Sequence, residues 1–309
     1  VSIDWHILEG SMFTFILIAV GPIALAAIAA PCIRFLIPRS VPPLSARTAL
    51  LTAIAGGISA LAFVLLRVFG FWYPSAINLD LRLGAMLPLV LGIVAVLLLM
   101  VPSSSQRTRA TAQISRRTVM SFLSPWWVAG AVVLVAIIVA LSIAAGVASR
   151  PDFEGHYTFY SITLGSMEMG TGIYGWYYCV PALFGLTVLL VTASIAWAVI
   201  PRTPWNDDLT HDAAVRRLRA DNIGRVTCAA LLVHLSTVLS SLGGTASMRG
   251  SASTTELGSV ATGTPFAALG PTLHTSAALT LAVGLTLWIL TALTAVPVGS
   301  RRTSPARAA

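Results

Sequence analysis

Apolar residues fall into seven long stretches along the chain, separated by shorter segments rich in Pro, Gly, Ser and Arg. A bilayer core of about 30 Å needs roughly 20 apolar residues for each helical crossing, and each stretch approaches or reaches that length. The pattern therefore predicts seven transmembrane helices, over residues 12–36, 48–70, 83–101, 126–147, 180–200, 226–244 and 276–297. The sixth contains a histidine and several hydroxyl side chains, and a six-span chain with a re-entrant segment 226–244 is the alternative.

The composition indicates that this is a membrane protein. Apolar residues make up 56% of the chain and charged residues only 10%, whereas about a quarter of the residues are charged in a soluble globular protein. So few charges cannot cover a core of this size, so apolar surface must face lipid. The expected fold class is all-α: a polytopic integral membrane bundle forming a single transmembrane domain.

The basic residues predict the orientation of the bundle, because Lys and Arg accumulate in short cytoplasmic loops. All 19 basic residues are arginines. With the N-terminus outside and the C-terminus in the cytoplasm, only Arg67, Arg82, Arg150 and Arg249 lie on the outer side, which leaves 15 of the 19 inside. A lysine-free chain rich in Arg and Ala is typical of a high-GC bacterium, so we expect a multi-pass protein of the bacterial plasma (inner) membrane.

The net charge of +8 requires no nucleic-acid partner. Basic cytoplasmic loops lie against anionic headgroups, an attraction worth about 1 kcal/mol per arginine near the surface. Membrane lipids, including anionic headgroups, are therefore expected partners and bound lipid is expected, while no cofactor is predicted. Arg67, one turn from the outer end of the second span, is expected to extend toward the headgroups.

The segments outside the spans differ in character. Residues 149–178 form an aromatic outer loop that we expect to be ordered, whereas 245–275 contain small polar residues and are expected to be flexible unless a partner holds them. The cytoplasmic segment 201–225 has acids before arginines, which favours a short helix near 211–222. Residues 298–309 are predicted to be a flexible basic tail.

Two features of the chain bear on processing and redox state. Residues 1–10 contain acids and no basic residue, so they lack the charged start of a cleaved signal peptide, and the first span is expected to be retained. Cys32 and Cys228 lie near inner ends of spans and Cys179 is alone near an outer end. Because no two cysteines share an oxidising side, no intramolecular disulfide is expected.

Several enzyme and receptor classes are excluded by missing residues. No Asp or Glu lies within a predicted span, so no aspartyl dyad forms there, and without lysine there is no retinal Schiff base. The sequence has no H-E-x-x-H pair, no G-x-S-x-G elbow and no phosphate-binding loop. Enzymatic activity is therefore uncertain and is not favoured.

His234 is the only ionisable residue near the middle of a predicted span. Helical spacing places it on one face with Thr227, Thr237 and Ser241. One interpretation is a substrate path along the sixth span, since ionisable groups in membranes are often functional. The other is a helix–helix polar face that binds neighbouring spans. Haem ligation by two histidines is not supported, because no second histidine lies in a span.

The outer loop offers a possible metal site. Asp152, Glu154 and His156 alternate along the chain and would share one face of a strand. Carboxylates and imidazole bind divalent metals, but the spacing is not that of a dedicated site, and solvated loop polarity is the other interpretation.

These observations favour a non-catalytic integral membrane component of a larger complex, either transport-associated or an accessory subunit. The alternatives are a self-sufficient permease or channel with a polar path along span six, and a membrane enzyme or metal-handling protein that uses the outer loop. In the favoured case we expect protein partner subunits to contact the aromatic outer loop and the mixed-charge inner loop. The candidate contact residues are Trp176, Tyr177, Tyr178, Arg216, Arg217 and Arg219.

Overall fold

The fold is described from a computed structural model. It describes residues 5–36, 42–72, 81–101, 122–164, 167–201, 209–254 and 258–296. The predicted basic tail, 298–309, lies outside the described residues.

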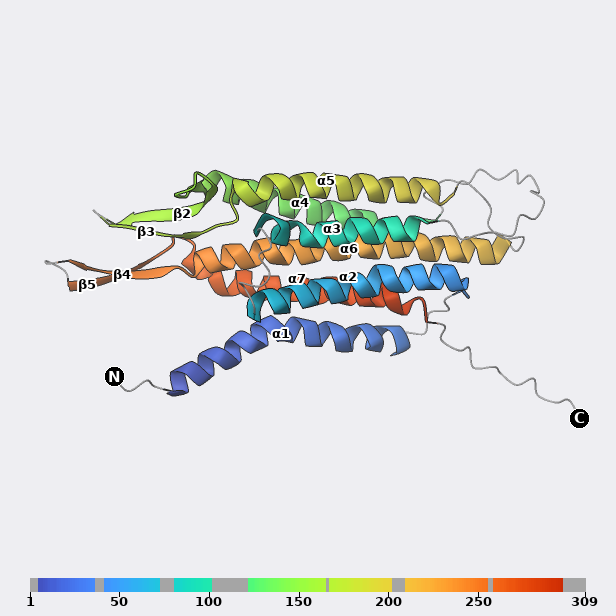
Figure 1. Ribbon diagram of the computed structural model, residues 1–309, viewed down its shortest axis with the longest axis horizontal. Coiled ribbons are helices and arrows are strands. Elements are labelled where there is room, and N and C mark those ends of the chain that lie inside the picture. Colours follow the sequence, from blue (N-terminus) through green and yellow to red (C-terminus); the bar gives the residue numbers. More distant parts are fainter. Residues whose placement is uncertain are drawn as a thin grey trace, which may run out of the picture.

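Seven helices in the described part of the chain lie side by side and form an elongated bundle (Figure 1). Successive helices run in opposite directions, so that α1 begins at one end of the bundle and α7 finishes at the other (Figure 1). Each predicted apolar stretch lies largely within one helix. The helices are α1 (Trp5–Leu36), α2 (Ala46–Trp72), α3 (Leu81–Met100), α4 (Pro125–Ala148), α5 (Trp176–Val199), α6 (Leu209–Ala246) and α7 (Gly270–Leu293).

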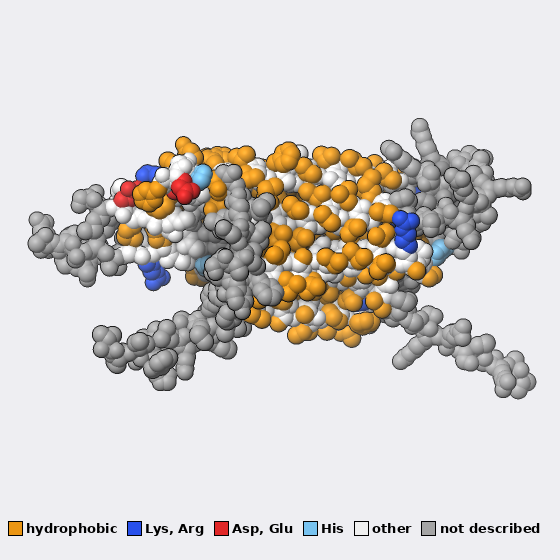
Figure 2. Space-filling model, viewed as in Figure 1, with side chains coloured by type: hydrophobic (Ala, Val, Ile, Leu, Met, Phe, Trp, Pro, Cys, Tyr) orange, Lys and Arg blue, Asp and Glu red, His pale blue; other side chains and the backbone are white. Residues whose placement is uncertain are grey.

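The sides of the bundle are apolar. Five helices, α2, α4, α5, α6 and α7, are long and apolar enough to cross a membrane, and two shorter apolar segments, Val20–Leu36 and Gly84–Met100, belong to α1 and α3. Hydrophobic side chains cover the middle of the face seen in Figure 2, and the described charged side chains lie toward its ends. Large side chains such as Ile28, Val132 and Phe184 are exposed. This is the surface expected of a multi-pass membrane protein.

Helix α6 forms the centre of the bundle. In the most apolar stretch of α6, 72% of the residues are buried by the rest of the protein. The corresponding share is 22% to 44% in the other four long apolar helices. Glycines allow the close packing around it: a Cβ on Gly284 of α7 would lie 3.0 Å from the Ala229 carbonyl oxygen of α6. On the other side of α7, a Cβ on Gly56 of α2 would overlap the Trp288 carbonyl oxygen and lie 2.6 Å from the Ala292 nitrogen. Such close backbone approaches are typical of helix packing in membranes.

Two small antiparallel sheets lie at one end of the bundle, which we call the strand end (Figure 1). The first has the order β1–β2–β3, and Phe159 pairs with Gly172 in its main hairpin. The second is the hairpin β4–β5, in which Arg249 pairs with Gly263. The strands are β1 (Arg150–Pro151), β2 (Tyr157–Leu164), β3 (Met167–Gly172), β4 (Arg249–Thr254) and β5 (Gly258–Gly263).

The two sheets contact each other and the bundle. A Cβ on Gly250 of β4 would overlap the Met169 side chain of β3, and the Thr245 hydroxyl at the end of α6 donates to the Gly172 carbonyl at 2.8 Å. The sequence predicts that residues 245–275 are flexible. The structure instead forms the β4–β5 hairpin and the short 3-10 helix η2 (Ala267–Leu269) within this segment. Backbone pairing forms this hairpin even though its small residues have little side-chain surface to bury.

The structure of the mixed-charge segment 201–225 also differs from the prediction where it is described. Instead of a separate short helix near 211–222, the chain continues in one helix of 38 residues, α6, from Leu209 to Ala246. In the first four turns of α6, Asp212, Arg216 and Arg219 are buried, and the two arginines donate to carbonyl and carboxylate partners. We call this opposite end of the bundle the arginine end.

Candidate functional site

His234 lies fully inside the protein, with 0% of its surface exposed. Its Nδ1 lies 3.1 Å from the carbonyl oxygen of Ala85 on α3. A carbonyl can only accept, so Nδ1 carries the proton. In the neutral ring Nε2 is then the acceptor, and it lies 3.5 Å from the hydroxyl of Tyr174. His234 thus connects α6 to α3 and to the segment before α5.

The two threonines of the predicted polar face make local hydrogen bonds. The Thr227 hydroxyl donates to the Ile223 carbonyl at 2.8 Å, and the Thr237 hydroxyl donates to the Val233 carbonyl at 3.3 Å. Thr227 is buried, while Thr237 and Ser241 are half-buried. Hydroxyls bonded to the preceding turn of their own helix do not need water or a substrate as partner.

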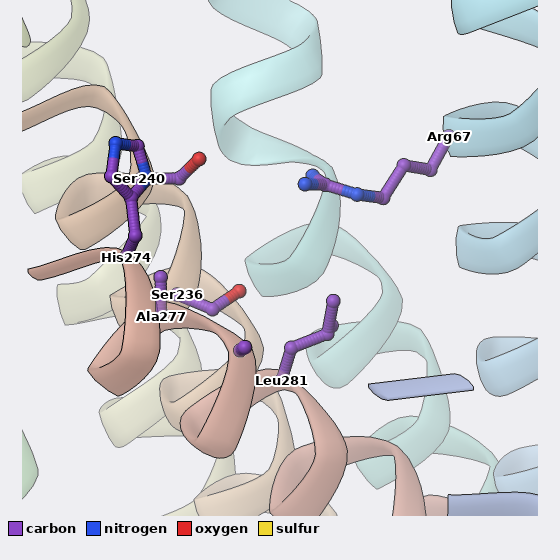
Figure 3. A pocket seen from close by; sticks show the side chains of 7 residues that line it. Arg67, Ser236, Ser240, His274, Ala277 and Leu281 are labelled. Carbon is purple, nitrogen blue, oxygen red and sulfur yellow. The ribbon is translucent and has the colours of Figure 1, made fainter. Parts of the chain in front are cut away.

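A small cavity near the strand end lies beside this face (Figure 3). Arg67 of α2, Ser236 and Ser240 of α6, and His274 of α7 give it polar walls, and Ala277, Ala278 and Leu281 line the remainder. Figure 3 shows the Arg67 side chain extended from α2 toward the side chains of α6 and α7. The volume is about 20 Å³, which is enough for about one water molecule. His234 and Thr237 are not among its lining residues.

The arginine end is held together by long-range hydrogen bonds to the ends of other helices. The last carbonyls of a helix have no partner within it and attract cations. Arg219 donates to the Leu99 and Val101 carbonyls at the end of α3, and Arg216 donates to the Ile200 carbonyl at the end of α5. Arg34 of α1 donates to two carbonyls at the end of α7, those of Leu293 and Val296, at 3.2 and 3.1 Å.

These contacts place the predicted inner partner residues in different environments. Arg216 is fully buried and pairs with Asp212 at 2.8 Å, and Arg219 is 5% exposed. Arg217 is exposed. Arg216 and Arg219 therefore act within the bundle, and Arg217 is the one of the three that faces outward.

The predicted metal residues form a turn. Asp152 Oδ1 accepts the backbone N–H groups of Glu154 and His156, both at 2.9 Å, and Oδ2 accepts the Thr158 hydroxyl at 2.7 Å. The Thr158 hydroxyl and these amides lower the pKa of Asp152. His156 Nδ1 lies 3.3 Å from Glu154. In the described part of the chain, no three His, Cys, Asp or Glu side chains gather in a metal-binding arrangement.

The aromatic partner candidates connect the first sheet to the bundle. Trp176, Tyr177 and Tyr178 are all half-buried. The Trp176 ring occupies the space beside Gly146 of α4, where a Cβ would lie 2.6 Å from the ring. The Tyr177 ring lies 4.2 Å, centroid to centroid, from the His156 ring.

Phe153 lies at the tip of the turn, and nothing in the sequence pattern predicts a role for it. It is fully exposed, at 109% of the reference surface. The turn around it is closed by the Asp152 N–H donating to the His156 carbonyl at 2.8 Å. Gly155 has a φ of 82°, a conformation that residues with a Cβ rarely adopt. Acidic and aromatic residues alternate in this turn, and this pattern could have drawn attention to Phe153. The pattern does not show that the Phe153 ring is exposed.

Comparison of the chain with known protein families, with curated proteins and with solved structures finds no match.

Proposed function

We propose that this protein is a non-catalytic integral membrane component of a larger complex, transport-associated or accessory, which binds a partner protein at its strand end. The observation that carries the proposal is a braced turn that presents Phe153. Asp152 fixes the turn through three hydrogen bonds, and the ring at its tip is fully exposed. Aromatic residues are enriched in protein interfaces, and a turn that is already ordered loses less entropy on binding.

The surrounding strand end supports a binding role. The two sheets are in contact through Met169 and Gly250, and the Tyr160 ring lies 5.5 Å from the Phe266 ring beside η2. Phe153 is therefore presented by a folded platform attached to the bundle. Interfaces of this kind combine an exposed anchor with a rigid support.

The permease alternative has less support. A cavity of about 20 Å³ accommodates one water molecule and is too small for a solute. His234 is also bonded to protein groups on both ring nitrogens. A metal-handling role is less favoured because the Asp152 oxygens already bind the turn.

We propose further that all seven helices cross the plasma membrane of a bacterium, with the strand end outside and the arginine end in the cytoplasm. The arginine distribution supports this orientation. A reporter that is active only in the cytoplasm should be active when fused after Arg307 and silent when inserted at Ser253. The opposite pattern would reverse the proposed orientation.

Partner binding is tested by gentle detergent extraction at native expression, followed by size measurement and identification of co-purified proteins. We expect a discrete complex that contains a protein partner with an exposed domain on the outer side. Phe153→Ser should weaken partner recovery by about tenfold, since an anchor residue contributes more than about 1.4 kcal/mol, without changing the melting temperature.

The control is Trp126→Ser, which removes an aromatic ring with 83% exposure near the arginine end. It should leave partner recovery unchanged. Recovery of the wild-type protein with lipid alone, or equal loss in both variants, would contradict the proposed contact.

A further inference from the structure

The cavity beside Arg67 combines this cation with two serines, a histidine and a few apolar side chains. Arg67 is exposed and has no hydrogen bond or ion pair to any residue in the described ranges, and the nearby walls include Ala277, Ala278 and Leu281. A charged side chain inside a membrane span is costly unless it is paired. The side chain extends toward α6 and α7 (Figure 3), so its charge is directed at this cavity.

Ser240 supplies a second donor. Its hydroxyl makes no hydrogen bond within the described part of the chain. The Ser236 hydroxyl, in contrast, donates to the Val233 carbonyl at 2.7 Å, so its oxygen is left as an acceptor only. The donors available to a ligand are therefore the Arg67 guanidinium and the Ser240 hydroxyl, which suits an anion.

His274 forms the wall nearest the strand end. Its ring lies against Gly243, where a Cβ would be 2.9 Å from the ring. Its Nε2 lies 3.3 Å from the Ser247 hydroxyl oxygen, and that hydroxyl donates to the Gly243 carbonyl, so Nε2 donates to Ser247. These contacts fix the ring and hold α7 against α6 at the mouth of the cavity.

The depth of the site matches a lipid phosphate. At a rise of about 1.5 Å per residue, Arg67 lies roughly 8 Å from the end of α2, Ser240 roughly 9 Å from the end of α6 and His274 roughly 6 Å from the start of α7. This is one to two turns inside the strand end, near the boundary between acyl chains and headgroups. The cavity volume of about 20 Å³ admits a single oxygen-sized group, while the rest of a headgroup remains outside.

We infer that Arg67 and Ser240 form a phosphate-binding site for the headgroup of an anionic phospholipid. One phosphate oxygen enters the cavity and accepts the Ser240 hydroxyl, and the exposed Arg67 guanidinium binds the phosphate oxygens at the mouth of the cavity. Guanidinium binds phosphate through two parallel hydrogen bonds, which ammonium cannot reproduce. This inference is independent of the proposed partner contact at Phe153.

The test is native mass spectrometry of the full chain in a neutral detergent, titrated with phosphatidylglycerol or phosphatidylcholine. We expect selective retention of phosphatidylglycerol by the wild-type protein. Arg67→Gln should weaken that retention by about tenfold, and Ser240→Ala should weaken it several-fold. Arg217→Gln, which removes the same charge from the exposed surface of α6, should weaken it less than Arg67→Gln, because a surface arginine contributes only general attraction to headgroups.

Arg67→Lys distinguishes specific binding of a phosphate by the guanidinium from general attraction between a positive charge and the headgroups. Lysine keeps the charge and can extend to the bilayer surface but lacks the planar fork, so retention should fall several-fold. If Arg67→Gln does not fold, Arg67→Lys and Ser240→Ala carry the test. Wild-type retention in all folded variants of these residues would overturn the site.

The source of the phosphate is tested in the same titration. If millimolar inorganic phosphate or glycerol phosphate does not displace the lipid, the headgroup of a phospholipid is the ligand. If either displaces it, and only when Arg67 is present, the site binds phosphate but a soluble phosphate also fills it. Both results support phosphate recognition by Arg67.

Discussion

Arg216 and Asp212 form an ion pair of 2.8 Å inside the bundle, one turn apart on α6, with 0% and 3% of their side-chain surfaces exposed. The pair lies where α6 passes the end of α5, and Arg216 also donates to the Ile200 carbonyl there. This relationship allows charged residues of α6 to lie buried at the arginine end of the bundle. The arginine neutralises the carboxylate and satisfies a carbonyl at the end of a neighbouring helix.

Arg216→Ala should be strongly destabilising, because it removes the guanidinium that pairs with the buried Asp212 carboxylate at 2.8 Å. Breaking one partner of a buried pair costs about 3–5 kcal/mol. The double variant Asp212→Ala/Arg216→Ala should be less destabilised than the single variant, and Arg217→Ala should change stability by less than about 0.5 kcal/mol. Unfolding of the purified protein in detergent measures all three. Equal, small effects for Arg216 and Arg217 would contradict the buried position of Arg216.

Gly56 and Gly57 offer a matched test of the contact between α2 and α7. A Cβ on Gly56 would overlap backbone atoms of α7, whereas one on Gly57 would lie 3.8 Å from the Ala292 Cβ, at ordinary contact distance. Gly56→Ala should therefore lower stability by about 1–3 kcal/mol, and Gly57→Ala should be nearly neutral. Melting temperatures in one detergent provide the comparison. The reverse order would mean that α2 and α7 cross elsewhere.

His234→Leu should lower stability without altering function per folded molecule. The change removes the hydrogen bonds to Ala85 and Tyr174, and interhelical bonds of this type contribute about 0.6–2 kcal/mol. Partner recovery, normalised to the folded fraction, is the functional measurement. A folded His234→Leu protein that loses partner recovery would show that His234 does more than join the helices.

The Asp152 turn should loosen in acid. Because hydrogen bonds lower the pKa of Asp152 in the folded turn, the carboxylate stabilises the turn above the ordinary Asp pKa of about 3.9. That contribution is lost as the pH falls through the lowered value. Hydrogen exchange of the amides of residues 152–158, corrected for intrinsic rates, should show this loss of protection. Thr158→Val removes the largest cause of the shift, so the transition should move to higher pH. An unchanged transition would mean that Thr158 does not bind the carboxylate.

The helices were predictable because lipid-facing and core residues are both apolar in a span, so length and composition reveal them directly. The interior position of Arg216 and Arg219 was not predictable. Arginines usually cap their own helix or face headgroups, whereas here their acceptors are carbonyls of α3 and α5, up to 120 positions away in the sequence. Nothing in the local charge pattern indicates such partners.

The sites show the same division between local and long-range information. The spacing of His234 and Thr227 placed them on one helical face. The partner of His234 is the Ala85 carbonyl, 149 positions away, and the spacing does not reveal this contact. Residues 249–263 have few β-branched or aromatic residues, so their hairpin gives little signal in the sequence. The cavity is lined by Arg67, Ser240 and His274, which come from three separate helices. Only the packing of α2, α6 and α7 brings them together, so the sequence pattern could not predict the cavity.

Cross-linking in intact cells tests the proposed partner contact most directly. A photoreactive residue at position 153 should yield a discrete protein adduct, because Phe153 is proposed to lie in the interface. The same residue at position 184, where Phe184 is 69% exposed on the apolar side of α5, should yield lipid adducts without that protein. If position 153 captures no protein while the chain is folded and in the membrane, binding of a partner through the strand end is contradicted.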